Sequence, residues 1–253
     1  MKSPIPTLSL LALALAVLPV SAQVPASAPN FVPLRVTSTE LPVFPHDLIQ
    51  LGVREGEVRI AFSVGTDGKL EDCLAVAYTH SEFARVTMGA LRRWKFEAAR
   101  YRGQPIATAT EVSVVFQVEG TVVVSLTPSE TLNVRLFSIL EGKEPYRPRA
   151  LKELDRIPTP IAAPSPGIPE NFAKATLARS VTVSFYIDED GKVRLPSVDS
   201  TEDAELGAAA IMAMRDWKFE PPTCRGRRVL VRASQVFNFR PPTPAPAATA
   251  SNG

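Results

Sequence analysis

Side chains that commonly carry chemistry are sparse in this chain, which has two histidines and two cysteines among 253 residues. Cys73 and Cys224 lie far apart in the sequence and form no CxxC pair. A single disulfide between them is possible, but the spacing of the two cysteines does not show that it forms. Cys73 also falls within an expected strand, where a small buried apolar residue would serve equally. His46 and His80 have no Cys, His or carboxylate at ligand spacing, and we expect both in solvated loops.

The acidic run from Asp188 to Asp190 is the segment most similar to a metal-binding loop. It lacks the later ligand positions and the distal Glu of a calcium loop, and it ends in Asp-Gly, which is typical of a solvated hairpin turn. The sequence also contains no GxGxxG, GxxxxGKS/T, HExxH or GxSxG motif. We therefore expect no enzyme, no catalytic residue, no cofactor and no metal, and we favour a binding role.

Charge and the first residues indicate where the protein acts. The 28 basic and 26 acidic residues are interspersed and give a net charge of +2, so no surface for nucleic acid is expected. Lys2, an apolar run from Leu8 to Val20 and the small pair Ser21-Ala22 match a secretory signal that is cleaved before Gln23. The run has about 13 residues where roughly 20 are needed to span a bilayer, which disfavours an uncleaved anchor. The mature protein is expected to have no membrane span.

An internal repeat organises most of the remaining sequence. A shift of 123 residues superposes two long segments without a gap, and chance does not keep such a register. We therefore expect two tandem copies of one module. The matched motifs are Asp67-Gly68-Lys69 with Asp190-Gly191-Lys192, Trp94-Lys95-Phe96-Glu97 with Trp217-Lys218-Phe219-Glu220, Arg102-Gly103 with Arg225-Gly226, and Phe116 with Phe239.

Within each copy the pattern predicts two strands, a helix and a third strand. Strict alternation along the first strand places one face on a core and the other on water or a partner. The Asp-Gly pair favours a hairpin into a second strand, a stripe at spacings of three and four predicts the helix, and a glycine turn leads into the last strand. The alternating residues are Val58, Ile60, Phe62 and Val64, then Val181, Val183, Phe185 and Ile187; the helical stripes are Phe83, Thr87, Leu91 and Trp94, then Leu206, Ala210, Met214 and Trp217.

The expected fold class is α+β, with two tandem β-β-α-β modules, each a three-stranded antiparallel sheet in the order 2-1-3 packed on one helix. Within the connector we expect Thr121 to Leu126 to extend a strand and Thr131 to Leu140 to form a short helix or another strand. The expected core aromatics are Phe62, Trp94, Phe96, Phe185, Trp217 and Phe219. The expected divisions are a signal peptide at 1–22, an extended segment at 23–40, the first module at 41–119, a connector at 120–160, the second module at 161–240 and a disordered Pro/Ala-rich tail at 241–253.

A Pro-rich lead-in, an Asp-Gly hairpin and a helix-end motif recur together in both copies. The lead-ins are 41–45 and 161–169, and the helix ends are Arg92-Arg93-Trp94-Lys95-Phe96 and Arg215-Asp216-Trp217-Lys218-Phe219. This combination resembles the carboxy-terminal domain of the TonB energy-transducer family. The resemblance implies a periplasmic protein that binds a segment of a periplasmic or outer-membrane protein, such as a receptor peptide. The uncleaved amino-terminal helix and long Pro-rich spacer of energy-transducing members are not recognised in this sequence.

The order 2-1-3 leaves the third strand of each copy with one neighbour and an open row of backbone groups, to which an extended partner can add. Alternatively the edges pair with each other, and the protein is a self-associating envelope scaffold; a third interpretation is an accessory component of TonB-dependent transport. Pro196 supports an edge position for the second strand of the second copy and puts its pairing in doubt. The expected partner-binding residues are Thr108, Thr110, Val112, Ser113, Val114, Val115, Phe116, Val229, Val231, Ala233, Gln235, Val236, Phe237 and Asn238.

Overall fold

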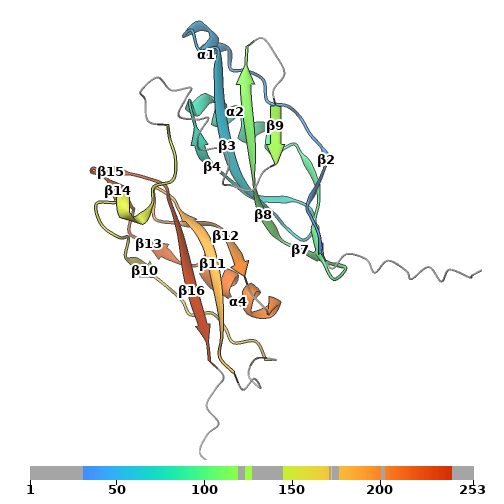
Figure 1. The fold of residues 1–253 in the computed structure, drawn as a ribbon, viewed down its shortest axis with the longest axis vertical. Coiled ribbons are helices and arrows are strands. Elements are labelled where there is room, and N and C mark those ends of the chain that lie inside the picture. The colour runs from blue at the N-terminus through green and yellow to red at the C-terminus, as the bar shows by residue number, and fades with distance from the viewer. Residues whose placement is uncertain are drawn as a thin grey trace, which may run out of the picture.

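The computed structural model describes residues 31–118, 123–126, 145–170, 172, 177–200 and 203–240. In Figure 1 each copy of the repeat forms its own antiparallel sheet with one long helix against it. The sheets have the orders β4-β3-β8-β9 and β12-β11-β16, so the predicted α+β class and the 2-1-3 order are confirmed. The main elements are β3 (Glu55–Val64), β4 (Leu70–Tyr78), α2 (Ser81–Leu91), β8 (Thr108–Gln117) and β9 (Val123–Leu126), then β11 (Arg179–Ile187), β12 (Val193–Ser200), α4 (Ala204–Arg215) and β16 (Val231–Phe239).

Short strands that precede the main sheet of each module pair with the segment that follows its helix. In the first module β2 pairs with β5 and β1 pairs with β6, while in the second β10 pairs with β13. The glycine turns that were predicted after each helix close the hairpins β6-β7 and β14-β15. The bounds are β1 (Phe31–Val32), β2 (Arg35–Ser38), α1 (His46–Gln50), β5 (Lys95–Glu97), β6 (Ala99–Tyr101), β7 (Gln104–Ile106), the 3-10 turn η1 (Leu151–Glu153), β10 (Pro160–Ala162), β13 (Lys218–Phe219), β14 (Thr223–Cys224) and β15 (Arg227–Arg228).

The stripes predicted that both tryptophans lie within the helices, but the structure places them just after the helix ends. The backbone N–H of Trp94 donates to the Leu91 carbonyl at 3.1 Å, and that of Trp217 donates to Met214 at the same distance, which closes the last turn of each helix. Each indole N–H then donates to a lead-in carbonyl, that of Glu40 at 2.9 Å and that of Pro164 at 3.0 Å. The tryptophans therefore hold the lead-in of each module against its helix end.

The Asp-Gly hairpins contact the Trp-Lys-Phe segment of their own module. Gly68 and Gly191 have φ values of +76° and +80°, the left-handed region that glycine adopts without strain. A Cβ at Gly191 would lie 2.0 Å from the carbonyl oxygen of Phe219, and one at Gly68 would lie 2.7 Å from that of Phe96. Backbone contact between the two motifs explains why both copies carry them together.

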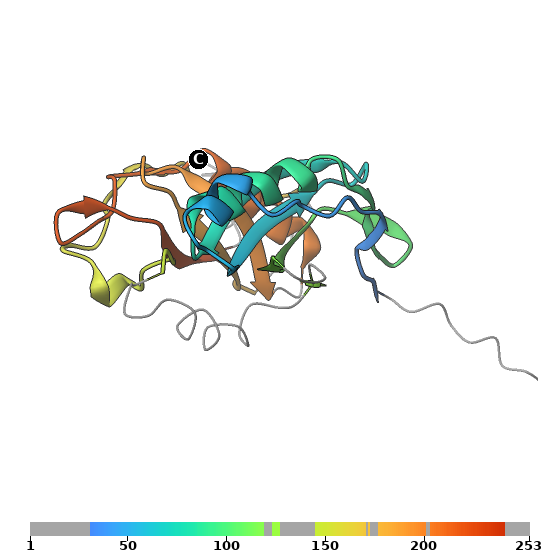
Figure 2. The same cartoon turned by 90° about the horizontal axis from the view of Figure 1, so that it is seen from above.

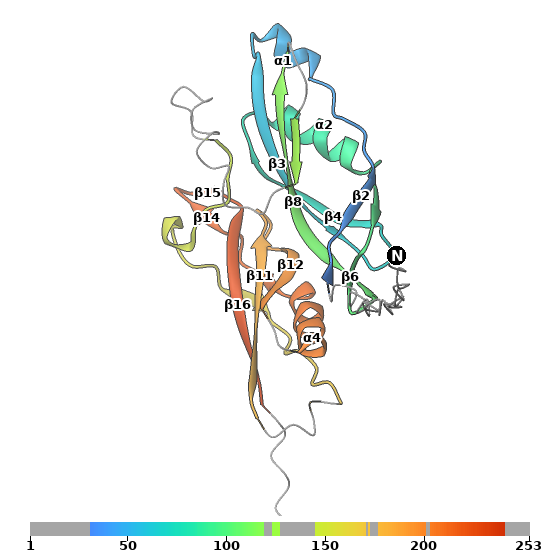
Figure 3. The same ribbon diagram turned by 45° about the vertical axis from the view of Figure 1, so that its right-hand side comes forward.

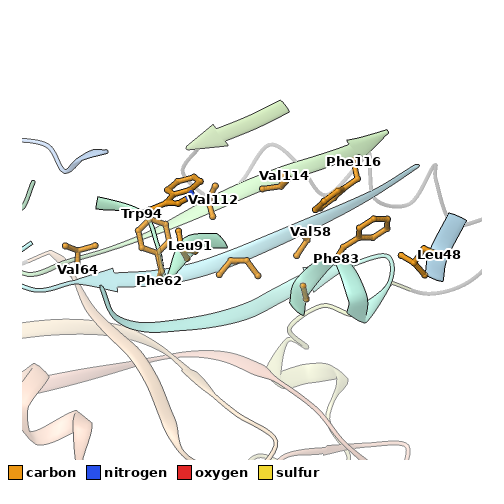
Figure 4. Packing of buried hydrophobic residues seen from close by; sticks show 12 residues of the cluster. Leu48, Val58, Phe62, Val64, Phe83, Leu91, Trp94, Val112, Val114 and Phe116 are labelled. Atoms are coloured by element: carbon orange, nitrogen blue, oxygen red, sulfur yellow. The ribbon is translucent and has the colours of Figure 1, made fainter. Parts of the chain in front are cut away.

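The core of the first module lies between the sheet and α2 (Figure 4), where Phe62 and Trp94 lie near one end and Phe83 and Phe116 near the other. The Phe83 and Phe116 rings stack with centroids 4.4 Å apart. The second core has the same plan, with Phe185 stacked on Phe219 at 5.9 Å. Burial of this apolar area on one face of each sheet supplies most of the stabilisation of a module of this size.

The faces of the two sheets that point away from the helices pack against each other. Figures 2 and 3 show the second module beside the first. A third apolar cluster joins them: Ala61 and Val76 come from the first sheet, Tyr186 and Leu195 from the second, and Leu230 directly precedes β16. The alternation in β3 and β11 predicted that the outward face would meet water or a partner, and at Ala61 and Tyr186 that partner is the other module.

Polar contacts surround this inter-module cluster. The Arg194 guanidinium pairs with the Asp72 carboxylate, with Nε to Oδ2 at 2.9 Å. The Tyr186 hydroxyl donates to Glu111 at 2.9 Å, and burial together with that carboxylate raises the tyrosine pKa, so the hydroxyl keeps its proton. From the connector, Tyr146 stacks on Tyr78 with ring centroids 4.5 Å apart. The two modules therefore pack together, with Tyr146 and Arg149 of the connector against them.

Pro196 lies in β12, an edge strand, as its missing N–H requires. Pairing with β11 continues on both sides of it, from Ser200 to Val193, with a register shift between Ser184 and Tyr186 that marks a bulge. Leu195, next to the proline, has a φ of +50° and is buried in the inter-module cluster. The bulge therefore turns the Leu195 side chain toward the first module without ending the strand.

Candidate functional site: the outer edge of the third strand

In the first module the predicted open edge is closed by the chain itself. Strand β9 pairs antiparallel with β8, placing Val123 opposite Val115 and Leu126 opposite Val112. The expectation that the third strand has one neighbour is therefore wrong for the first module over Val112, Ser113, Val114 and Val115. The backbone groups on that side of β8 are already used.

In the second module β16 is the last strand of its sheet within the part of the chain that the structure describes. Arg149 forms a parallel bridge with Val231, and its N–H donates to the Leu230 carbonyl at 2.8 Å. Because backbone groups alternate in direction along a strand, those of every second residue from Leu230 point away from β11. The register with β11 is unbroken, which assigns the outward direction to Ser234, Val236 and Asn238.

A groove of about 370 Å³ runs along this edge. One wall is β16 from Gln235 onward, and the other is the lead-in from Ala163 to Ile168. Two apolar side chains in it are strongly exposed, Ile168 at 51% and Val236 at 48%. The Val236 carbonyl accepts from the Gln235 side-chain amide at 2.9 Å. The groove therefore combines the outward N–H groups of an edge strand with apolar surface, the two features that bind an extended peptide.

Trp217 connects the two walls of the groove. Its indole N–H bonds to the Pro164 carbonyl on the lead-in side, and its ring packs edge-on against Phe237 of β16 with centroids 5.7 Å apart. Trp94 is 7% exposed, whereas Trp217 is half-buried and lines the groove. The equivalent tryptophans therefore differ: the second has a surface that a ligand can touch.

The other predicted partner-binding and core residues take the following places. Val229 precedes β16 and donates its N–H to the Pro222 carbonyl at 3.0 Å, so it is not an edge position. Thr108, Thr110 and Phe116 lie in β8 beyond the span that β9 covers. Val231, Ala233 and Phe237 point their side chains into the second core, while Phe62, Phe185 and Phe219 are buried and Phe96 is partly buried.

The polar candidates from the sequence do not assemble into a reactive centre among the described residues. Cys73 and Cys224 are both free, and burial raises the pKa of the Cys73 thiol. His46 is exposed but begins helix α1 rather than lying in a loop, and His80 is half-buried beside Phe83 rather than solvated. No group of three or more His, Cys, Asp or Glu side chains in the described ranges is placed to hold a metal ion. None of the described helices is long and apolar enough to cross a membrane.

Two features of the site were not predicted from the sequence. The groove depends on the lead-in that Trp217 holds beside β16, and a tryptophan that bonds a distant carbonyl leaves no local sequence signal. The closure by β9 did have a signal, because Val122, Val123 and Val124 are consecutive β-branched residues soon after β8. A strand over Thr121 to Leu126 was expected, but the pairing of Val123–Leu126 with β8 was not predicted.

The fold is a tandem of two-layer modules, each with an antiparallel sheet, one long helix and the same signature motifs. The family model for the Gram-negative bacterial TonB protein C-terminal matches residues 40–118 and 165–241, and the chain belongs to this family. The solution NMR structure of the Pseudomonas aeruginosa TonB C-terminal domain is similar at 22% identity, covering 38% of this chain and 94% of that one with a TM-score of 0.30. A search of curated proteins found no match.

Proposed function

We propose that the protein is an exported periplasmic binding protein that takes up an extended segment of another envelope protein by strand addition at β16. The observation that carries this proposal is the groove in which the outward backbone groups of Val236 and Asn238 lie beside exposed apolar side chains. An added strand would satisfy those groups and cover Ile168 and Val236 at the same time. Membership of the TonB C-terminal family supports protein interaction as the general role.

Proline replacement at an outward position tests strand addition. Val236→Pro and Asn238→Pro each remove a backbone donor that faces away from β11, so we expect both variants to fold and to lose capture of a partner from periplasmic and outer-membrane extracts. The matched controls Val236→Ala and Asn238→Ala keep the N–H, so each should capture more partner than the proline variant at the same position. Circular dichroism checks the fold of all four variants. Undiminished capture by both folded proline variants would rule out β16 as the binding edge.

The same variants separate ligand binding from self-association. If β16 pairs with β16 of a second copy, the wild-type protein has a dimeric mass in solution and the proline variants become monomeric. Under the proposal, the oligomeric mass is unchanged by either proline. A proline-dependent loss of dimer without any captured partner would favour the scaffold interpretation.

Cleavage after Ala22 is the expectation for the amino terminus, which lies outside the described residues. The short apolar run and the Val20-Ser21-Ala22 pattern favour a mature protein that begins at Gln23. Intact mass of the protein from a cell fractionation should give that species in the periplasmic fraction. A membrane-bound species that retains residues 1–22 would contradict the periplasmic assignment.

A further inference from the structure

The position of β9 in the first module corresponds to the groove in the second. A shift of 123 residues moves the four β8 residues that pair with β9, Val112 to Val115, onto Gln235 to Asn238. All four of these β16 residues line the groove. The first module therefore already holds, from its own connector, a strand at a place where the described part of the second module has none (Figure 1).

The second module does not carry the sequence that would close its edge in the same way. The residues that correspond to β9 are Pro246, Ala247, Ala248 and Thr249, and Pro241, Pro242 and Pro244 precede them. Proline has no backbone N–H and is excluded from a strand that must donate hydrogen bonds. A hairpin return like that from β8 to β9 is thus disfavoured after β16.

We infer that the two copies have unequal roles: β9 permanently occupies the edge of the first, and the second binds one segment per chain with the chemistry of β9. This inference rests on the proposed function of β16. The ligand is an extended, proline-free segment of at least four residues, rich in β-branched apolar side chains like Val123-Val124-Ser125-Leu126, and it runs antiparallel to β16.

Two observations support that ligand chemistry and direction. Val236 is 48% exposed and Ile168 is 51% exposed in the groove, so an apolar segment would bury both, whereas a highly charged one would desolvate charge against them. Antiparallel pairing gives straighter hydrogen bonds than parallel pairing and is slightly more stable per residue. The register of β8 with β9 then places a Ser125 equivalent opposite Val236 and a Val123 equivalent opposite Asn238.

The probe for this inference is a synthetic peptide of residues 121–127 with a fluorescent label, titrated into the mature protein. We expect saturation at one peptide per chain, because the tethered β9 has a high effective concentration at β8 and is not displaced. Val236→Ala removes only the apolar contact of this side chain, whereas Val236→Pro also removes the N–H, so the proline variant should bind at least about tenfold more weakly than the alanine variant. A peptide carrying Ser125→Pro lacks the N–H that faces β16 opposite Val236, so it is the negative control and should not bind.

Disulfide cross-linking then determines the direction of the bound peptide relative to β16. The protein used carries Cys73→Ala and Cys224→Ala, so that it has no other thiol. Antiparallel addition predicts rapid cross-links between protein Val236→Cys and peptide Ser125→Cys, and between protein Asn238→Cys and peptide Val123→Cys. Parallel addition about the same centre would instead join Val236→Cys to Val123→Cys and Asn238→Cys to Ser125→Cys. Dominance of the second set, or saturation at two peptides per chain, would overturn the inference.

The failure of this inference is distinguishable from failure of the proposed function. If the peptide does not bind while a partner captured from extracts still requires the N–H of Val236, strand addition stands and the β9-like chemistry is wrong. If neither the peptide nor a captured partner depends on that N–H, both are wrong.

Discussion

Trp94→Ala is expected to unfold the first module, with a loss of roughly 3 to 5 kcal/mol in the free energy of unfolding. The ring is 7% exposed and lies with Phe62 and Leu91 in the first core (Figure 4). Its removal leaves a large cavity and also frees the Glu40 carbonyl that the indole N–H bonds. Such a loss takes most of the stability of a small module. Denaturant unfolding followed by circular dichroism measures it.

The chain offers an internal control for this experiment, because it has two tryptophans, one in each module. In Trp94→Ala the fluorescence of Trp217 reports the second module alone. The reciprocal Trp217→Ala should cost less, about 2 kcal/mol, since that ring is half-buried and forms part of the groove. Full stability of Trp94→Ala together with a loss of partner capture would show that the ring is a ligand contact rather than core.

Val76→Asp is expected to separate the two modules. Val76 is 1% exposed within the inter-module cluster, and an unpaired carboxylate there costs at least about 3 kcal/mol. We expect the wild type to melt in one transition and the variant in two, with a larger radius of gyration by small-angle scattering. Val43→Asp is the matched control, because Val43 is 79% exposed and the same change there should have little effect.

A single lowered transition in Val76→Asp, without expansion, would mean that Val76 stabilises the first module only. Arg194→Ala provides the second measurement, since it removes the ion pair with Asp72 but leaves the β4 side chains in place. If Val76 stabilises the interface between the modules, Arg194→Ala should also weaken the thermal coupling of the two modules, so that their unfolding begins to separate into two transitions.

Much of each module could be predicted because its signals are local. Alternation in β3 and β11, the Asp-Gly turns and the apolar stripes of α2 and α4 each arise within about a dozen residues, and the repeat doubles every observation. The positive φ values at Gly68 and Gly191 require glycine, so the Asp-Gly pairs in the sequence directly indicate the turns. The predicted helices extended too far and included the tryptophans, because periodicity specifies helix ends only weakly.

The arrangement of the modules could not be predicted in the same way. The alternation of apolar and polar residues in the strands predicted which side chains point away from the helix, but it did not predict what covers those side chains. The apolar pair Leu74 and Val76 on the outward face of β4 was a usable sign that this face is buried. The difference between the two edges depends on pairing between β8 and β9 and on the lead-in that Trp217 holds, and such long-range contacts leave no pattern within a single element.

The most direct test of strand addition at β16 is amide hydrogen exchange, measured on the free protein and on the complex with the partner recovered by capture. Backbone hydrogen bonds to an added strand slow exchange at the amides that donate to it. The account predicts new protection at Ser234, Val236 and Asn238 in the complex, with no change along α4. Protection that appears on α4 or on the exposed loops, while those three amides exchange as in the free protein, would contradict it.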